Sequence, residues 1–138
     1  KALDMIMAEG LENVFARHAT MAAMTHAAVE RWSEGQVISF NITEPAERSN
    51  SVTTVRVEGD GAGRLLDWCA EECGVTLGIA IGDIAGKGFR IAHMGHVNAP
   101  MMLGTLGVVE SGLIALDMPH GPGGLAAAAH HLGTALKV

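Results

Sequence analysis

The chain has 138 residues, which fits a single domain, and 49% of them are hydrophobic, which is enough for a buried core. Its formal net charge of −6 argues against nucleic acid and anionic membrane surfaces as partners, because both require a basic face. No apolar run approaches the roughly 18 residues of a membrane span, so we expect neither kind of partner.

From Ala2 to Trp32 the sequence predicts one long helix. A stripe recurs with a mean step near the helical period of about 3.6 residues, and its members are Leu3, Met7, Leu11, Val14, His18, Met21, Thr25, Ala28 and Trp32. Gly10 interrupts the stripe at a cost of about 1 kcal/mol relative to alanine, and we expect the helix to continue through it. Such a helix would be roughly 46 Å long, whereas a compact chain of this size is roughly 37 Å across. No capping residue precedes Ala2, so we expect the helix to continue upstream and the chain to be a fragment.

Strands and shorter helices follow this first helix. Alternating and β-branched residues predict strands at 37–42, 52–57, 75–79 and 89–94, and helical patterns cover 64–73, 98–116 and 125–136. Asn98 is placed to cap the second of these helices, with Pro100 in its first turn. The order α-β-β-α-β-β-α-α predicts an α/β (α+β) fold in one domain, residues 1–138, in which helices cover a small mixed or antiparallel sheet of about four strands.

The stretch 82–100 is the most informative part of the chain. A glycine-spaced loop leads into a short apolar run that contains one guanidinium, on Arg90. Because alternate residues of a strand face opposite sides, Phe89 and Ile91 should point one way and Arg90 the other. An arginine among apolar neighbours needs an anion. The plain alternative is a sheet-edge arginine that is paired with an acid or simply solvated.

Several segments, in the same order along the chain, resemble one family. Residues 89–98, which read FRIAHMGHVN, and residues 101–106, which read MMLGTL, are similar to the C-terminal signature of class V, fold-type-I aminotransferases. The resemblance is strongest to the alanine/serine–glyoxylate group. The start of the first helix and the segment 48–53 resemble the same family. The likeness covers nearly the whole chain, but only the small domain of such an enzyme.

This resemblance implies a transaminase that depends on pyridoxal 5'-phosphate and moves an amino group from serine, alanine or a similar donor to glyoxylate or pyruvate. It also implies a homodimer in the cytoplasm. In the family, the arginine of this motif binds the α-carboxylate of the amino acid or 2-oxo acid, and Arg90 is the matching residue. Arginine suits that role, because its planar fork makes two parallel bonds that fix a carboxylate's orientation. Ala92 departs from the pattern, since the family usually has glycine there.

The resemblance implies equally what the chain does not supply. In the family, the Schiff-base lysine, the acid that pairs with the pyridine nitrogen and the phosphate-binding groups belong to the large domain. We therefore expect this chain alone neither to bind the cofactor nor to transaminate. Two other functions stay open, namely a non-catalytic domain that senses an amino acid and a free-standing dimerisation domain. The amino donor also stays open among serine, alanine and ureidoglycine.

The glycine-rich loop 82–88 does not match a nucleotide-binding P-loop. Its glycine spacing is one residue short, Gly88 stands where a Ser or Thr would bind magnesium, and a strand follows instead of a helix. A glycine-permissive turn beside a substrate site explains the loop better. Lys87 lies in this turn and not in an apolar pocket, so we do not expect it to form a Schiff base.

The histidines and cysteines give no strong metal motif. On a strand, the spacing of His93 and His96 directs their rings to opposite faces, which makes joint ligation of a metal awkward. The family resemblance implies instead a position near the mouth of the active site, and their role is left open. Cys69 and Cys73 lie on successive turns of one helix, where a disulfide would constrain almost nothing. Reduced thiols are expected, and the alternative of a two-cysteine metal half-site lacks a second ligand pair at a zinc-like spacing.

Overall fold

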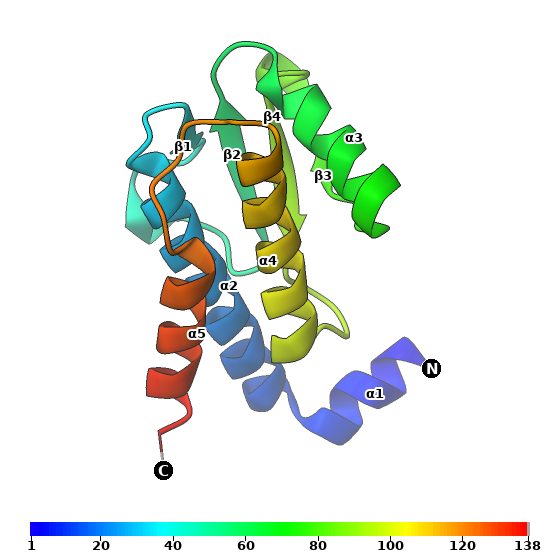
Figure 1. Ribbon diagram of the computed structural model, residues 1–138. Coiled ribbons are helices and arrows are strands. Elements are labelled where there is room, and N and C mark those ends of the chain that lie inside the picture. Colours follow the sequence, from blue (N-terminus) through cyan, green and yellow to red (C-terminus); the bar gives the residue numbers. More distant parts are fainter. Residues whose placement is uncertain (138) are drawn as a thin grey trace.

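One antiparallel sheet of four strands, accompanied by five helices, makes up the computed structural model, which describes residues 1–137 (Figure 1). The helices are α1 (Ala2–Glu9), α2 (Leu11–Ser33), α3 (Gly61–Cys73), α4 (Ala99–Ala115) and α5 (Gly124–Ala135). The strands are β1 (Ile38–Phe40), β2 (Val52–Val57), β3 (Gly78–Ile79) and β4 (Gly88–Ala92), in the spatial order β1-β2-β4-β3. Short 3-10 turns lie at Pro45–Glu47 and Gly82–Ile84. The predicted class, helices on a small antiparallel sheet, is confirmed.

The helices cover one face of the sheet and leave the other face open. α2 and α3 contact the strands directly, α4 lies in front of the strands in Figure 1, and α5 packs against α2 and α4. The strand residues buried against these helices are Ile38, Val55, Val57, Phe89 and Ile91. Their neighbours along the strands, including Arg56 and Ala92, point to the opposite face and are exposed. The sheet therefore presents a polar surface on the side away from the core.

The start of α4 and the end of α3 lie where the sequence predicts them. Asn98 caps α4, because its side-chain oxygen accepts a hydrogen bond from the Met101 amide at 3.0 Å. Gly74 ends α3 in the left-handed conformation that favours glycine, at φ 66°. Among residues 1–137, no helix combines the length and the apolar character needed to cross a membrane.

The expectation of one continuous first helix is wrong. Gly10 adopts φ 87° and separates α1 from α2. The Glu9 carboxylate then accepts hydrogen bonds from Arg17 Nε at 2.6 Å and Arg17 Nη2 at 2.8 Å. In an unbroken helix these two residues would lie about 12 Å apart along the axis, so the ion pair requires the bend. The predicted stripe is buried at Val14 and from Met21 onward, whereas Leu3 on α1 is 70% exposed.

A single carboxylate joins three helices in the core. Glu110 on α4 accepts a hydrogen bond from Nε1 of Trp32, a fully buried residue of α2, at 3.1 Å. The same carboxylate oxygen accepts the backbone N–H of Leu125, in the first turn of α5, at 2.5 Å. A negative charge at this position is favourable, because unpaired N–H groups gather at a helix N-terminus. Glu110 therefore satisfies two donors that would otherwise lack a partner.

We expect Glu110→Ala to lower the free energy of unfolding by about 1–3 kcal/mol, because it leaves the Trp32 and Leu125 donors unpaired. Glu110→Gln, which keeps one acceptor oxygen, should lose less. Urea denaturation followed by tryptophan fluorescence measures both. Glu30→Ala is the matched control, since Glu30 is exposed on α2 and should change stability by less than about 0.5 kcal/mol. Equal losses of unfolding free energy in Glu110→Ala and Glu30→Ala would contradict this role of Glu110.

Candidate functional site

Arg90 lies in the middle of β4, an inner strand of the sheet. Phe89 and Ile91 are buried on the helix side, and Arg90 is half-buried on the open face, so the predicted alternation is confirmed. Arg90 Nε donates a hydrogen bond to the backbone oxygen of Ile79 at 2.8 Å. Within residues 1–137 no acidic side chain forms an ion pair with Arg90. The alternative of an edge arginine paired with an acid of the described chain does not apply.

Two glycines make room for this arrangement. Gly78 on β3 lies directly opposite Arg90, and a Cβ added there would lie 3.2 Å from Arg90 Cβ. Gly88, two residues before Arg90 on the same strand, packs so closely on β2 that a Cβ would collide with the backbone oxygen of Val55. Gly88 therefore belongs to the strand and is required for strand approach, whereas Gly82 and Gly86 adopt the positive φ values of a turn.

The guanidinium of Arg90 lines a hollow of about 320 Å³ on the open face. The hollow is walled by Asn41, Thr54, Arg56, Ile81, Asp83, Ile84 and Arg90. Thr54 pairs directly with Arg90 across β2 and β4. The sequence analysis found Arg90 but missed its neighbours in the hollow. Alternation along 52–57 could have placed Arg56 on the face opposite Val55 and Val57, but pairing of that strand with β4 was not visible in the sequence.

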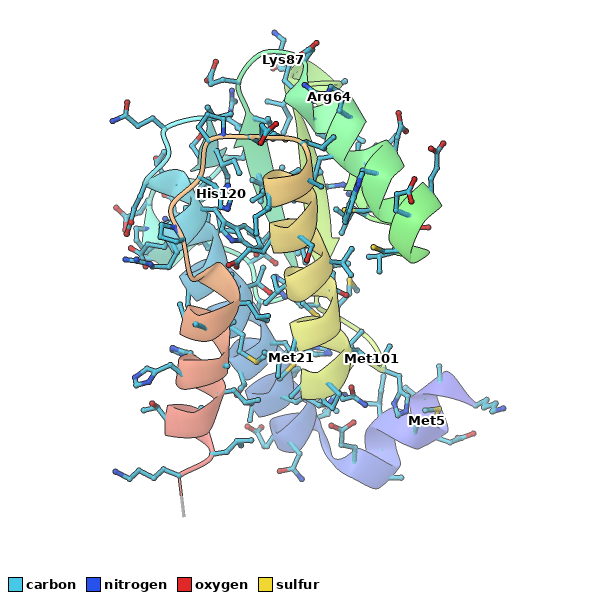
Figure 2. The ribbon with its side chains drawn as sticks, viewed as in Figure 1. Met5, Met21, Arg64, Lys87, Met101 and His120 are labelled. Carbon is cyan, nitrogen blue, oxygen red and sulfur yellow. The ribbon has the colours of Figure 1, made fainter. Side chains whose placement is uncertain are left out.

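The lysines of the chain do not fit a Schiff-base site for pyridoxal phosphate. The sequence has three lysines, and Lys1, Lys87 and Lys137 are all exposed. Lys87 lies in the turn before β4, and Figure 2 shows it at the end of the molecule opposite α1. None of the three lines the hollow around Arg90. The part of the chain that the structure describes therefore offers no attachment point for the cofactor.

The expectation that His93 lies near the mouth of an active site is wrong, because His93 is fully buried. Its Nδ1 lies 3.0 Å from the backbone oxygen of Asn50, which only accepts, so Nδ1 carries the proton. Its Nε2 then accepts from the Thr53 hydroxyl at 2.9 Å. His26 packs edge-on against His93 and against Phe40, and its Nε2 is buried without a hydrogen-bond partner. This pair forms a buried histidine layer beneath the start of β2.

His96 is separate from this layer. It is exposed and lines a second hollow of about 150 Å³, between α1 and the start of α2. Within residues 1–137, no group of three or more histidine, cysteine or acidic side chains is arranged to hold a metal ion. Cys69 is buried and Cys73 is exposed, and both are free thiols. Burial raises the pKa of Cys69 to about 11, with a smaller contribution from Cys73, so Cys69 is a poor nucleophile.

Comparison with known proteins finds relatives among the glyoxylate aminotransferases. The chain is 40% identical over 135 residues to the serine–glyoxylate aminotransferase of Arabidopsis thaliana, covering 95% of this chain and 32% of that protein. It is 37% identical over 130 residues to the L-aspartate–glyoxylate aminotransferase of Paracoccus denitrificans, covering 93% and 32%. The solved pyridoxamine–pyruvate aminotransferase of Mesorhizobium loti matches with a TM-score of 0.84 at 26% identity, covering 96% of this chain and 33% of that one.

The chain is homologous to glyoxylate aminotransferases, and its solved structural neighbours are class V aminotransferases, which is consistent with the small C-terminal domain of such an enzyme. It spans about a third of the length of the curated relatives it matches. No protein-family model matches the sequence. The resemblance based on residues 89–98 and 101–106 is thus confirmed, and the open face that carries Arg90 is part of an aminotransferase fold.

The pKa shifts of His26 and His93 predict that acid lowers the stability of this chain. Burial lowers the pKa of His26 to about 4, with smaller effects from His93 and Arg48, and burial also lowers the pKa of His93. A histidine whose pKa is lower in the folded state than in the unfolded state contributes its full stabilisation of the fold at pH values above its unfolded pKa. That stability is lost as pH falls from about 6.5 through the folded value, because the unfolded chain then binds more protons.

We expect the protein to lose on the order of 1 kcal/mol of stability between pH 6.5 and pH 5 through His26, after allowance for its partial exposure. His26→Phe, which keeps a ring against Phe40 and His93, should remove this part of the loss. Thermal unfolding of both proteins across that pH range measures the difference. Parallel pH profiles for the wild type and His26→Phe would show that His26 is not responsible.

Proposed function

We propose that this chain acts as the small domain of a pyridoxal-phosphate-dependent transaminase, and that Arg90 binds the carboxylate of the amino acid and of the 2-oxo acid. Glyoxylate or pyruvate would accept the amino group. The observation that carries this proposal is the hydrogen bonding of the Arg90 guanidinium. Its Nε is fixed by the Ile79 carbonyl, and its two terminal nitrogens have no hydrogen-bond partner within residues 1–137.

This geometry suits carboxylate binding for a physical reason. The hydrogen bond at Nε orients the guanidinium plane without neutralising it, because a backbone carbonyl carries no net charge. The two terminal nitrogens are then available for parallel charge-assisted bonds to one carboxylate. Such a pair fixes both the position and the rotation of the substrate. In a transaminase, rotation about the α-carbon decides which of its bonds reacts, so a rigid fork serves the chemistry better than a mobile cation.

The cofactor and its lysine would be supplied by another part of the protein. Pyridoxal phosphate provides the electron sink of transamination when it is bound, and the exposed lysines described above do not fit its attachment. Apolar side chains on α1 and the start of α2 support a covering domain, since Leu3, Met7 and Phe15 are 70%, 66% and 58% exposed. We propose that a larger cofactor-binding domain covers this surface and faces the hollow around Arg90.

Several finer points belong to the same proposal. The family resemblance implies a homodimer and a cytoplasmic location. The donors named for the relatives are serine and L-aspartate, so these join alanine and ureidoglycine as candidates. Activity of the intact protein with glyoxylate distinguishes the transaminase from the two alternatives, an amino-acid-sensing domain and a dimerisation domain, because neither of those would transfer an amino group.

In the intact enzyme we expect Arg90→Lys to raise KM for both amino acid and oxo acid, by about tenfold to a hundredfold, because lysine keeps the charge and loses the fork. The absorbance of the bound cofactor should not change. Steady-state kinetics with glyoxylate and a panel of donors measure the KM values, and visible spectroscopy measures the absorbance of the cofactor. Arg64→Lys is the control, since Arg64 lies on α3 and does not line the hollow. Unchanged KM values would remove Arg90 from the site.

We also expect Gly78→Ala to raise KM by a few-fold with little loss of stability, because the added Cβ crowds the Arg90 side chain and tilts its fork. Gly63→Ala serves as the matched control, because a Cβ at Gly63 of α3 meets nothing within 4 Å. Kinetics of the two variants, with a thermal melt of each, make the comparison. If Gly78→Ala and Gly63→Ala both leave KM at the wild-type value, β3 does not position Arg90.

A further inference from the structure

A second arginine lies beside Arg90 in the same hollow. Arg56 on β2 pairs with Gly88, and Thr54, two residues earlier, pairs with Arg90. Arg56 and Arg90 are therefore diagonal neighbours on the open face, which in antiparallel sheets are about 7 to 8 Å apart. Both line the hollow of about 320 Å³. The open face thus brings two guanidinium groups to one site.

These two arginines differ from the other four in how they are bonded. Arg17, Arg31, Arg48 and Arg64 each donate a terminal nitrogen to an oxygen of the protein. Arg90 and Arg56 donate only Nε, to the Ile79 backbone oxygen at 2.8 Å and to Asn41 Oδ1 at 2.9 Å. Both acceptors are neutral. Within residues 1–137, both forks are therefore held in place while their terminal nitrogens lack a protein partner.

The charge of the hollow favours a ligand with two negative groups. Asp83 is the one acidic side chain among the residues that line it, and it forms no ion pair with either arginine within residues 1–137. The two arginines outnumber this one acid, so the lining of the hollow carries a net positive charge. Thr54 and Asn41 lie between and beside the arginines as neutral hydrogen-bonding groups.

We propose that Arg56 determines substrate specificity by binding the second carboxylate of a dicarboxylic amino acid while Arg90 binds the α-carboxylate. This inference rests on the proposed function, and it names the donor class as acidic amino acids with a short side chain. Arg56 lines the same hollow as Arg90, and its bond to Asn41 sets the direction of its fork. Donors without a second carboxylate would use Arg90 alone.

The test uses the intact enzyme loaded with its cofactor, with glyoxylate as acceptor and L-aspartate or L-alanine as donor. We expect Arg56→Gln to raise KM for aspartate about tenfold or more, while KM for alanine and glyoxylate changes less than about twofold. Asp83→Asn, which removes the acid of the hollow, should lower KM for aspartate. Arg64→Gln is the matched control and should leave both donors unchanged.

Inhibition of the unmodified enzyme gives a second measurement that does not depend on the folding of a variant. Succinate should compete with the amino donor at least about tenfold more strongly than butyrate, because only succinate can reach both forks. Equal inhibition by the two acids overturns the proposal. So does an equal rise of KM for aspartate and alanine in Arg56→Gln, or activity with alanine and none with aspartate.

Failure of this inference can be told from failure of the proposed function. If Arg90→Lys raises KM for all substrates but Arg56→Gln does not discriminate between donors, only the role of Arg56 is lost. If no donor transfers an amino group to glyoxylate, the proposed function itself fails, and the specificity of Arg56 fails with it.

Discussion

The hydrogen bond between Arg90 Nε and the carbonyl of Ile79 is the contact on which the open face depends. It fixes a cation on an inner strand without cancelling its charge. It also requires β3 to approach β4 without a side chain in the way, which Gly78 allows. A carboxylate in place of that carbonyl would hold the arginine equally well but would compete with any anionic ligand. Arg17 is the contrasting case in the same chain, because its guanidinium is paired with the carboxylate of Glu9.

The core lies on only one side of the sheet, which explains why the open face is not covered by helices. Alternation along β2 and β4 sends valine, phenylalanine and isoleucine to the helices and sends Thr54, Arg56 and Arg90 to the other side. The helices on the apolar side are tied together at Glu110, where Trp32 and the first turn of α5 share one carboxylate. The packed core and the candidate site thus lie on opposite faces of a single sheet. A substitution on the open face can change the site while the core stays intact.

Several features of the site lay within reach of the sequence, and others did not. Alternation in residues 89–91 was sufficient to place Arg90 opposite Phe89 and Ile91, because strand geometry alone dictates it. Arg56 lies on a strand whose limits were predicted correctly, yet its position beside Arg90 depends on which strands pair and in which register. His93 was misplaced even though alternation from Phe89 and Ile91 puts it on the same buried face. Its partners, Thr53 on β2 and Asn50 just before that strand, were not visible in the sequence. Periodicity carries no information on such long-range contacts.

The sequence by itself determined the order of the strands and of the helices after the first, the cap at Asn98, the side of the sheet on which Arg90 lies and the aminotransferase resemblance. These follow from local spacing and from short motifs. Tertiary structure alone decided the break at Gly10, which the bidentate Glu9–Arg17 pair accompanies, and the meeting of Arg56 with Arg90 in one hollow. The physical reason is the same for both. Each depends on side chains that approach only after distant or bent segments have packed, and no local preference encodes that approach.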